Sequence, residues 1–471
     1  MKRTRTKIVA TIGRQNDTEF IKSLYEAGAS TFRLNTAHQE PEETSGIVDR
    51  IREVTDKAAI LVDTKGPEVR TIDMTDALEV KEGDEVYIIP RGESLDKPHF
   101  FVSYDKFHEV MDKDTDVLID DGELSMTAVE VKGTTVKCVI NNSGVIKNKK
   151  SVNVPNKSIP LPALTEKDKR YIHFACEKKI DYIAHSFVRN KEDLKEVQDI
   201  LDQYDSSIKI ISKIENMEGV NNIDEILDHC HGVMVARGDL GIELPAEEVP
   251  IMQKSLIKKC VQRRKAVITA TQMLHTMIEN PRPTRAEVSD VANAVMDGTD
   301  AVMLSGETAY GDYALEAVQT MAAIAGKMEN SMAPRLKVDD LIEMNPTRFH
   351  MSKNAVKLAK TLNVQAIIIQ TDSGRTAQLI SAYRGAIPVL ALSPNPTVMR
   401  QMALSYGIEA FHLDQMDSLD QMVSESIKIL LKENQIKESD LILMVGSSPK
   451  NSNVTNFLEV GEAGQFLGGR E

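Results

Sequence analysis

The feature that most constrains the fold is a short apolar run that recurs along the chain. Each run is rich in Val, Ile and Ala, which is typical of a strand buried on both faces of a parallel sheet. Eight runs precede Ala325, and they are Lys7–Ile12, Ser30–Asn35, Ala59–Asp63, Asp181–Ser186, Ile208–Ser212, Gly232–Ala236, Ala266–Thr271 and Asp300–Leu304. Most are roughly 25 to 35 residues apart, which leaves room for one helix between neighbours. The spacing predicts repeated βα units that close into a (β/α)8 TIM barrel.

Four of the intervening segments have the apolar spacing of helices. They are Thr18–Ala27, Glu192–Tyr204, Ala246–Arg264 and Arg285–Met296. Thr284 stands directly before the last of them, where it is expected to cap the helix.

One interval between predicted strands is much longer than the others. Between Asp63 and Asp181, stretches such as Asp84–Ile89 and Thr127–Val131 alternate polar and apolar residues, as exposed strands do. We expect a small all-β domain, a β-barrel, over residues 70–156. It is inserted after the third strand of a catalytic barrel formed by residues 1–69 and 157–335. At the carboxyl rim of that barrel it is positioned to act as a lid.

A second α/β series follows Ala325, after a connector over Ser331–Arg348. Its predicted strands are Val364–Gln370, Ile387–Ser393, Ile408–Leu413 and Leu441–Val445. Helices are expected at Asn354–Leu362, Thr376–Arg384, Thr397–Ser405 and Leu419–Glu433. This alternation predicts an open, doubly wound α/β domain over residues 336–471.

Composition narrows the class of protein. A chain of 471 residues is too long for one core and should form about three domains. Its net charge of −14 argues against a general affinity for nucleic acid or for an anionic membrane. The four cysteines are scattered, which indicates structural thiols, and no run approaches the ~20 apolar residues of a membrane helix. We therefore expect a cytoplasmic protein.

Polar residues follow nearly every predicted strand. Lys213 and Glu215 follow the fifth strand, and Asp239 follows the sixth. Because the carboxyl ends of parallel strands meet at one rim, the two carboxylates are expected to provide oxygen ligands for a hard divalent cation. A metal beside a lysine suits chemistry on a phosphorylated anion. The alternative at this stage is a pair of charged turns that flank ordinary strands.

Longer blocks of sequence resemble the pyruvate kinase family along nearly the whole chain. They are Lys7–Gly13, Asp63–Thr71, Ile211–Asn216, Val235–Glu243, Asn280–Glu287 and Met303–Thr308. Several such blocks in order are far more specific than a single motif. The resemblance implies Mg²⁺-dependent phosphoryl transfer from phosphoenolpyruvate to ADP, which gives pyruvate and ATP in the last step of glycolysis. It also implies a homotetramer.

The resemblance assigns a role to each residue at the rim. Glu215 and Asp239 are the implied Mg²⁺ ligands, and Lys213 neutralises the phosphoryl group during transfer. The substrate-binding residues are then Arg33 for the phosphate, the backbone N–H groups of Gly238 and Asp239 for the carboxylate, and Thr271, which completes the pocket.

Arg70 and Lys150 match the nucleotide-phosphate contacts of the family. They stand at the two junctions of the predicted insertion. For Lys150 the alternative is a solvated cation, because it ends the charged run Lys147–Lys150.

The potassium site departs from the family pattern. Members bind K⁺ through an asparagine amide, a serine hydroxyl, an aspartate carboxylate and a threonine carbonyl, and three of these are kept as Asn35, Asp63 and Thr64. Ala37 stands at the serine and has no hydroxyl to offer. Water, or Thr36 after a shift, would have to replace it. Glu68, which accompanies K⁺ dependence in the family, is present. We therefore expect K⁺ activation that is retained but weaker.

A second anion site is expected in the last domain. Thr371, Ser373, Gly374, Arg375 and Thr376 lie between a predicted strand and a predicted helix, where hydroxyl and N–H groups can bind a phosphate. This loop resembles the family's sugar-phosphate effector loop, and residues 447–455 are expected to close over it. The alternative is an ordinary capped start of a helix.

Two other functions remain to be weighed. A catalytically silent homologue that binds metabolites or partners is expected to have lost Lys213, Glu215, Asp239 or Thr271, and all four are present. A carboxylating or lyase-type barrel enzyme that acts on phosphoenolpyruvate has no need of the inserted domain or of Arg70.

Overall fold

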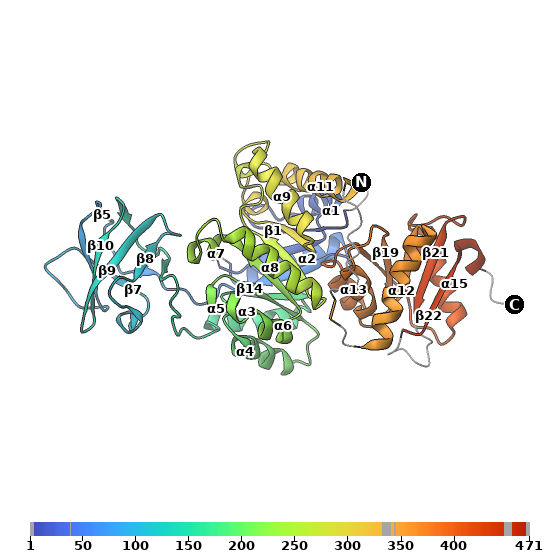
Figure 1. The fold of residues 1–471 in the computed structure, drawn as a ribbon, viewed down its shortest axis with the longest axis horizontal. Coiled ribbons are helices and arrows are strands. Elements are labelled where there is room, and N and C mark those ends of the chain that lie inside the picture. The colour runs from blue at the N-terminus through green and yellow to red at the C-terminus, as the bar shows by residue number, and fades with distance from the viewer. Residues whose placement is uncertain (1–3, 38, 332–340, 343–344, 447–454, 468–471) are drawn as a thin grey trace.

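The chain forms three bodies arranged in a row (Figure 1). This computed structural model describes residues 4–37, 39–331, 341–342, 345–446 and 455–467. The inserted sheet domain lies at one end, the barrel lies in the centre, and the C-terminal domain lies at the other end. None of the helices in the described ranges combines the length and the apolar character that a membrane crossing requires.

Eight parallel strands form the central barrel. They are β1 (Lys7–Ile12), β2 (Thr31–Asn35), β3 (Ala59–Asp63), β13 (Tyr182–His185), β14 (Lys209–Ile214), β15 (Gly232–Ala236), β16 (Ala266–Ala270) and β17 (Ala301–Leu304). The sheet closes in the order β1-β17-β16-β15-β14-β13-β3-β2. The predicted barrel is therefore confirmed.

Alternation along the strands builds two apolar layers. Val9, Leu61 and Ile268 point into the barrel interior, whereas their neighbours Ile8 and Val62 pack under the surrounding helices. Burial of each large aliphatic side chain contributes roughly 1.5–3 kcal/mol. The strands are thus fixed from both faces, so residues that follow their carboxyl ends have a rigid base.

Helices follow the strands and cover the barrel. They are α1 (Thr18–Ala27), α2 (Pro41–Val54), α3 (Glu166–Glu177), α4 (Lys191–Asp202), α5 (Met217–Asn221), α6 (Ile223–His229), α7 (Arg237–Glu243), α8 (Val249–Gln262), α9 (Arg285–Asp297), α10 (Gly306–Ala309) and α11 (Ala314–Ser331). The predicted cap is present, because the Thr284 hydroxyl accepts the N–H of Glu287 while the Glu287 carboxylate accepts that of Thr284.

The insertion between β3 and β13 is built almost entirely of strands. These are β4 (Thr71–Ile72), β5 (Leu78–Val80), β6 (Glu85–Ile88), β7 (His99–Val102), β8 (Asp116–Ile119), β9 (Leu124–Lys132), β10 (Thr135–Ile140), β11 (Gly144–Ile146) and β12 (Val152–Asn153). Seven of them pair in the order β12-β8-β9-β10-β6-β7-β4, and β11 pairs with β5. An antiparallel bridge between Arg70 and Ser151 lies just before the two edge strands and connects them.

The C-terminal domain is an open α/β sheet with helices on both faces. Its elements are α12 (Pro346–Leu362), β18 (Ala366–Gln370), α13 (Arg375–Ala382), β19 (Val389–Ser393), α14 (Pro396–Met402), β20 (Ile408–His412), α15 (Leu419–Lys432), β21 (Leu441–Gly446) and β22 (Phe457–Glu462). The strand order is β20-β19-β18-β21-β22. Separate apolar cores lie on the two faces.

Two details of this domain differ from the sequence prediction. The expected connector ends earlier, because α12 begins at Pro346, where Asn345 caps the N–H of Arg348 and proline suits the first helical turn. The edge strand β22 was missed. It contains Gly461 and is only half-buried, so it lacks the apolar run that marked the other strands.

Candidate active site

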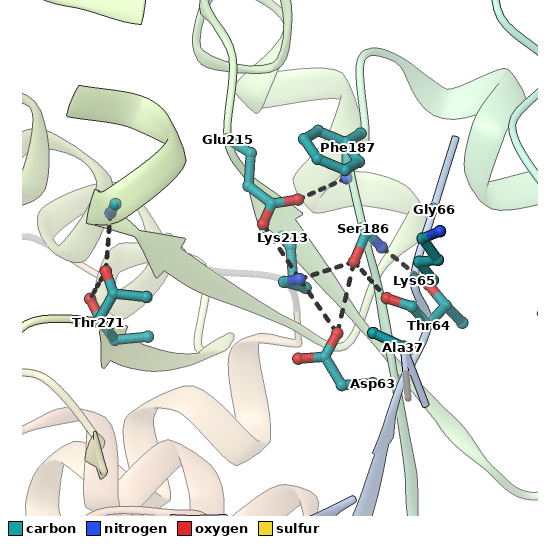
Figure 2. Close-up of polar contacts among 12 residues, drawn as sticks. Ala37, Asp63, Thr64, Lys65, Gly66, Ser186, Phe187, Lys213, Glu215 and Thr271 are labelled. Carbon is teal, nitrogen blue, oxygen red and sulfur yellow. Dashed lines mark hydrogen bonds and ion pairs between the residues drawn. The ribbon is translucent and has the colours of Figure 1, made fainter. Parts of the chain in front are cut away.

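Lys213, near the end of β14, is surrounded by oxygen atoms. Its Nζ lies 3.1 Å from Asp63 Oδ1 and 3.1 Å from Glu215 Oε1, and it donates to Ser186 Oγ at 2.6 Å (Figure 2). Burial alone would lower the pKa of Lys213, but the carboxylates of Asp63 and Glu215 outweigh it and raise that pKa. The side chain is therefore a fixed positive charge at the rim.

Asp63, the last residue of β3, binds two cations. Arg33 Nε donates to Asp63 Oδ2 at 2.6 Å, and Arg33 Nη1 donates to Thr11 Oγ1 at 3.1 Å. Burial would raise the pKa of the Asp63 carboxyl, but Lys213 and Arg33 together lower it. Asp63 is thus ionised, and it orients both cations toward the same rim.

Glu215 and Asp239 form a pair of carboxyl groups next to Lys213. Their side chains hydrogen-bond to each other, and Glu215 Oε2 also accepts the N–H of Phe187 at 2.7 Å. Burial raises the pKa of Glu215 to about 7, against the opposing charge of Lys213, and it also raises the pKa of Asp239. Two buried carboxyls in contact are a suitable base for a hard divalent cation, which favours their ionised forms.

This pair supplies only part of a metal's coordination shell. Over the described ranges, the chain contains no group of three or more His, Cys, Asp or Glu side chains that could hold a metal. A divalent cation bound by Glu215 and Asp239 alone would therefore keep positions for substrate oxygens and water.

Thr271 and Gly238 meet on the other side of the rim. Thr271 Oγ1 accepts the N–H of Gly238 at 2.7 Å and donates to the Ala270 carbonyl at 2.6 Å. Arg237 secures this contact, because it donates to the Thr271 carbonyl at 2.7 Å and pairs with Asp290 at 2.6 Å. The short helix α7 places Gly238 and Asp239 in its first turn, so both lie at a helix N-terminus.

Backbone strain marks the same region. Thr271 has a φ of 67°, and Phe187 has a φ of 55°. A left-handed conformation costs a β-branched or bulky residue on the order of 1–3 kcal/mol and persists where the surrounding structure enforces it, often at functional sites. The strained residues here are those that orient Gly238 and Glu215.

The two predicted nucleotide contacts lie at the junction with the inserted domain. Arg70 pairs with Glu68 at 2.7 Å, and Lys150 pairs with Asp120 at 2.6 Å. Both are partly exposed, and Lys150 is paired with Asp120 rather than surrounded by solvent alone. The neighbouring carboxylate of Asp121 contributes to the raised pKa of Asp239, which indicates that this turn of the insertion faces the rim.

The three predicted potassium ligands lie on adjoining strand ends. Asn35 Oδ1 accepts the N–H of Ala37 at 3.1 Å, and the Thr36 hydroxyl donates to the Asp63 carbonyl at 2.9 Å. Thr36 is therefore already engaged in a buried hydrogen bond. The Thr64 carbonyl instead accepts the hydroxyl of Ser186 at 2.6 Å.

The predicted effector loop lines a cavity of about 250 Å³ in the C-terminal domain. Gly374 has a φ of 74° and donates its N–H to Thr371 Oγ1 at 3.0 Å. Arg348, which the sequence did not single out, and Arg375 line the same cavity. Of the segment expected to close over the loop, residues 447–454 lie outside the described residues, and Thr455 bonds to Thr376 at 2.8 Å.

The sequence assigned no role to two residues of this site. Ser186 was recognised only as a polar residue at a strand end, and Arg237 was given no role. Nothing local distinguishes them, because their partners come from other strands.

The geometry first defines a class of protein. A closed parallel barrel that gathers Lys213, Arg33 and paired carboxyls at its carboxyl rim is a barrel enzyme with an anion-binding active site. Comparisons with known proteins then define the family. Residues 3–318 match the family described as "Pyruvate kinase, barrel domain", and residues 350–461 match "Pyruvate kinase, alpha/beta domain".

Individual relatives match nearly the whole of this chain. The chain is 44% identical to a pyruvate kinase of Borreliella burgdorferi, across 99% of this chain and 98% of that protein. It is 42% identical to a pyruvate kinase of Geobacillus stearothermophilus, across 98% of this chain and 80% of that protein. The crystal structure of a pyruvate kinase from Cryptosporidium parvum superposes with a TM-score of 0.93 at 34% identity, covering 98% of this chain and 96% of that one. The chain belongs to the pyruvate kinase family, and the enzyme is a phosphotransferase.

Proposed function

We propose that the carboxyl rim of the barrel transfers the phosphoryl group of phosphoenolpyruvate to ADP, with Mg²⁺ held by Glu215 and Asp239. When bound, the metal would supply Lewis-acid charge that offsets the negative charge of the transferring phosphoryl group. The observation that carries the proposal is the position of Lys213, 3.1 Å from both Asp63 and Glu215.

In this proposal the residues of the chain act by position and charge. Phosphoryl transfer has little covalent chemistry for the protein to perform, so fixed cations account for most of the catalysis. Lys213 stabilises the charge of the moving phosphoryl group, while Arg33 binds the substrate phosphate. Thr271 and the first turn of α7 hold the substrate carboxylate. The Gly238 N–H donates to Thr271 Oγ1 in the described state, so it must turn from that oxygen to reach the carboxylate.

The nucleotide is proposed to bind beneath the inserted domain. Arg70 and Lys150 stand on the two neighbouring segments that connect this domain to the barrel. Each of these side chains is oriented by a carboxylate, Glu68 or Asp120. A phosphate of the nucleotide can replace that carboxylate as the partner. The inserted domain then positions ADP opposite the phosphoenolpyruvate site.

A coupled assay for ADP-dependent pyruvate formation tests the reaction. The proposal predicts turnover that requires Mg²⁺ and both substrates. A silent homologue forms no pyruvate, and a carboxylating or lyase-type enzyme consumes phosphoenolpyruvate without ADP. Omission of ADP and omission of Mg²⁺ are the matched controls.

Potassium is proposed as an activator bound by Asn35, Asp63 and Thr64. Each of these residues provides an oxygen atom. Oxygen ligands of this kind can replace the water molecules that surround an alkali cation in solution. We expect turnover to rise with K⁺ but to need more of it than an enzyme with the complete ligand set. A rate indifferent to K⁺ would contradict this.

We also propose that the C-terminal cavity binds a phosphorylated effector. The observation that favours it is the pair of cations, Arg348 and Arg375, which line the cavity beside the hydroxyls of Thr371 and Ser373. Fructose 1,6-bisphosphate and AMP are titrated separately into the assay. One of the two compounds should change the KM for phosphoenolpyruvate. Arg375→Met should remove that response, whereas no response in the wild-type protein would contradict the proposed effector site.

The homotetramer stays a prediction, which light scattering of the purified protein can test.

A further inference from the structure

The potassium site of this chain lacks a hydroxyl where Ala37 stands, and a second hydroxyl lies close to the remaining ligands. Ser186, directly after β13, places its Oγ 2.6 Å from the Thr64 carbonyl oxygen and 3.4 Å from Asp63 Oδ1 (Figure 2). Both of those oxygens belong to the proposed cation site. We infer that Ser186 supplies the hydroxyl ligand that Ala37 cannot, an inference that rests on the proposed potassium activation.

The orientation of Ser186 is fixed by the surrounding structure. Its N–H donates to Thr64 Oγ1 at 3.1 Å, while its hydroxyl donates to the Thr64 carbonyl. These reciprocal bonds join the ends of β3 and β13, and the residue is 1% exposed. A ligand held in this way loses little conformational entropy when an ion binds.

The hydroxyl also has capacity for a cation. A serine oxygen has one proton to donate and two lone pairs to accept with. Ser186 donates to the Thr64 carbonyl and accepts one hydrogen bond from Lys213, which leaves a lone pair. The 3.4 Å to Asp63 Oδ1 exceeds a usual O–H···O hydrogen bond of about 2.5–3.0 Å, so this contact is weak in the described state.

Thr36, the alternative donor, is less suited. Its hydroxyl and its N–H both point to the Asp63 carbonyl, at 2.9 and 3.2 Å, and the residue is fully buried. This oxygen contacts the main-chain carbonyl of Asp63, which is not one of the proposed ligands. Ser186 Oγ instead contacts two oxygens of the proposed site.

Ser186 thereby links the cation site to Lys213. A cation on Ser186 Oγ, Thr64 O and the Asp63 carboxylate would add positive charge within the contact shell of Lys213. We expect the cation to neutralise part of the negative charge of Asp63. This weakens the ion pair between Asp63 and Lys213, so that Lys213 can turn toward a phosphoryl group. Potassium would then act through the position of Lys213 as well as through the substrate.

Thallium(I), which replaces K⁺ and is detected by NMR, provides a test that needs no turnover. It is titrated into the full-length protein with Mg²⁺ and phosphoenolpyruvate but without ADP. Ser186→Cys keeps the approximate size of the side chain and serves as a control for folding. Ser186→Ala removes the ligand altogether. Ser186→Ala should weaken thallium binding by roughly 10-fold or more, an effect typical of lost support at a metal site.

The matched control returns the missing hydroxyl. In the Ala37→Ser background, Ser186→Ala should weaken thallium binding by less than about 3-fold, because the hydroxyl restored at position 37 then provides the oxygen; such non-additivity is the mark of two residues sharing one role. An equal loss in both backgrounds would overturn the inference, as would unchanged binding in Ser186→Ala. A loss in Thr36→Val with none in Ser186→Ala would assign the ligand to Thr36 instead.

Two measurements distinguish failure of this inference from failure of the proposed function on which it rests. A Ser186 that only orients Lys213 would change the KM for phosphoenolpyruvate while thallium affinity stays the same, and that result also overturns the inference. Absence of pyruvate formation by the wild-type protein would instead end the proposed function. Thermal unfolding and the Ser186→Cys variant identify any change caused by misfolding.

Discussion

Asp300 and Arg384 join the barrel to the C-terminal domain through a bidentate contact. Arg384 Nη1 and Nη2 donate to the two oxygens of Asp300 at 3.0 and 2.8 Å. Both side chains are largely buried, and Asp300 also accepts the N–H groups of Tyr406 and Val267. A similar pair, Asp181 with Arg400 at 2.7 Å, lies at the amino end of β13. The C-terminal domain is thus fixed to the end of the barrel opposite the active site.

Arg384→Met should destabilise the protein strongly. Removal of one partner leaves the other charge buried without compensation, which costs about 3–5 kcal/mol. The matched control is Arg170→Met, which breaks an exposed pair with Glu40 and should cost under about 1 kcal/mol. Urea unfolding of the two variants measures the difference. Equal losses of unfolding free energy in the two variants would show that the interdomain pair contributes no more to stability than an exposed pair.

Glu215→Gln should impair the Mg²⁺ requirement and catalysis together. The amide cannot carry the negative charge that a divalent cation needs, so we expect kcat to fall roughly 10²–10³-fold and the Mg²⁺ concentration for half activity to rise. Glu192→Gln, an exposed carboxylate on α4, is the control and should change neither. If Glu215→Gln had wild-type kinetics and Mg²⁺ dependence, the proposed metal site would be wrong.

Thr271 should be replaceable by serine but not by alanine. Serine keeps the oxygen that accepts the Gly238 N–H at 2.7 Å, so Thr271→Ser should retain kcat/KM within a few-fold. Thr271→Ala loses that oxygen and should reduce kcat/KM for phosphoenolpyruvate about 10²-fold. Steady-state kinetics at saturating ADP provide the comparison. Two variants of equal activity would exclude a role for the hydroxyl.

Arg70→Met should weaken ADP more than phosphoenolpyruvate. Arg70 stands at the junction with the inserted domain, and loss of a charge-assisted phosphate contact of about 1.5–3 kcal/mol should raise the KM for ADP roughly 10–100-fold. Arg91→Met, which removes an exposed arginine paired with Asp73 on the same domain, is the matched control. A rise in the KM for phosphoenolpyruvate alone would contradict the nucleotide assignment.

His185 should make the protein less stable in acid. Its side chain is 1% exposed, and neither ring nitrogen has a hydrogen-bond partner in the part of the chain that the structure describes. Burial lowers the pKa of His185 to about 4, against an unfolded value near 6.5. The unfolded chain therefore binds the proton more readily, so this stability is complete above pH ~6.5 and is lost as the pH falls toward 4.

Urea unfolding at neutral pH and near pH 5 checks the prediction. The wild-type protein should lose about 2 kcal/mol more than His185→Gln over this range, since each pKa unit is worth about 1.4 kcal/mol. His412→Gln, which changes an exposed histidine, should behave like the wild type. Identical losses in all three proteins would contradict a neutral buried His185.

Much of the fold followed from local pattern. A β-branched run such as Gly232–Ala236 is apolar throughout because both faces of a barrel strand are buried, and the structure places β15 at the same residues. Strand spacing then determined the barrel, and the block matches indicated the family. The half-buried strand β22 was not predicted, since an edge strand needs no continuous apolar run.

The sequence alone located the ends of the barrel strands to within two residues, and it therefore predicted that Lys213, Glu215 and Asp239 lie at one rim. Only the tertiary structure decided which of these side chains touch. Ser186 reaches Thr64 across 122 positions of sequence, and Arg400 reaches Asp181 across 219. The physical reason is that strand periodicity is a short-range property of the chain, whereas a side-chain contact depends on the rotamers and packing of segments that meet only after folding.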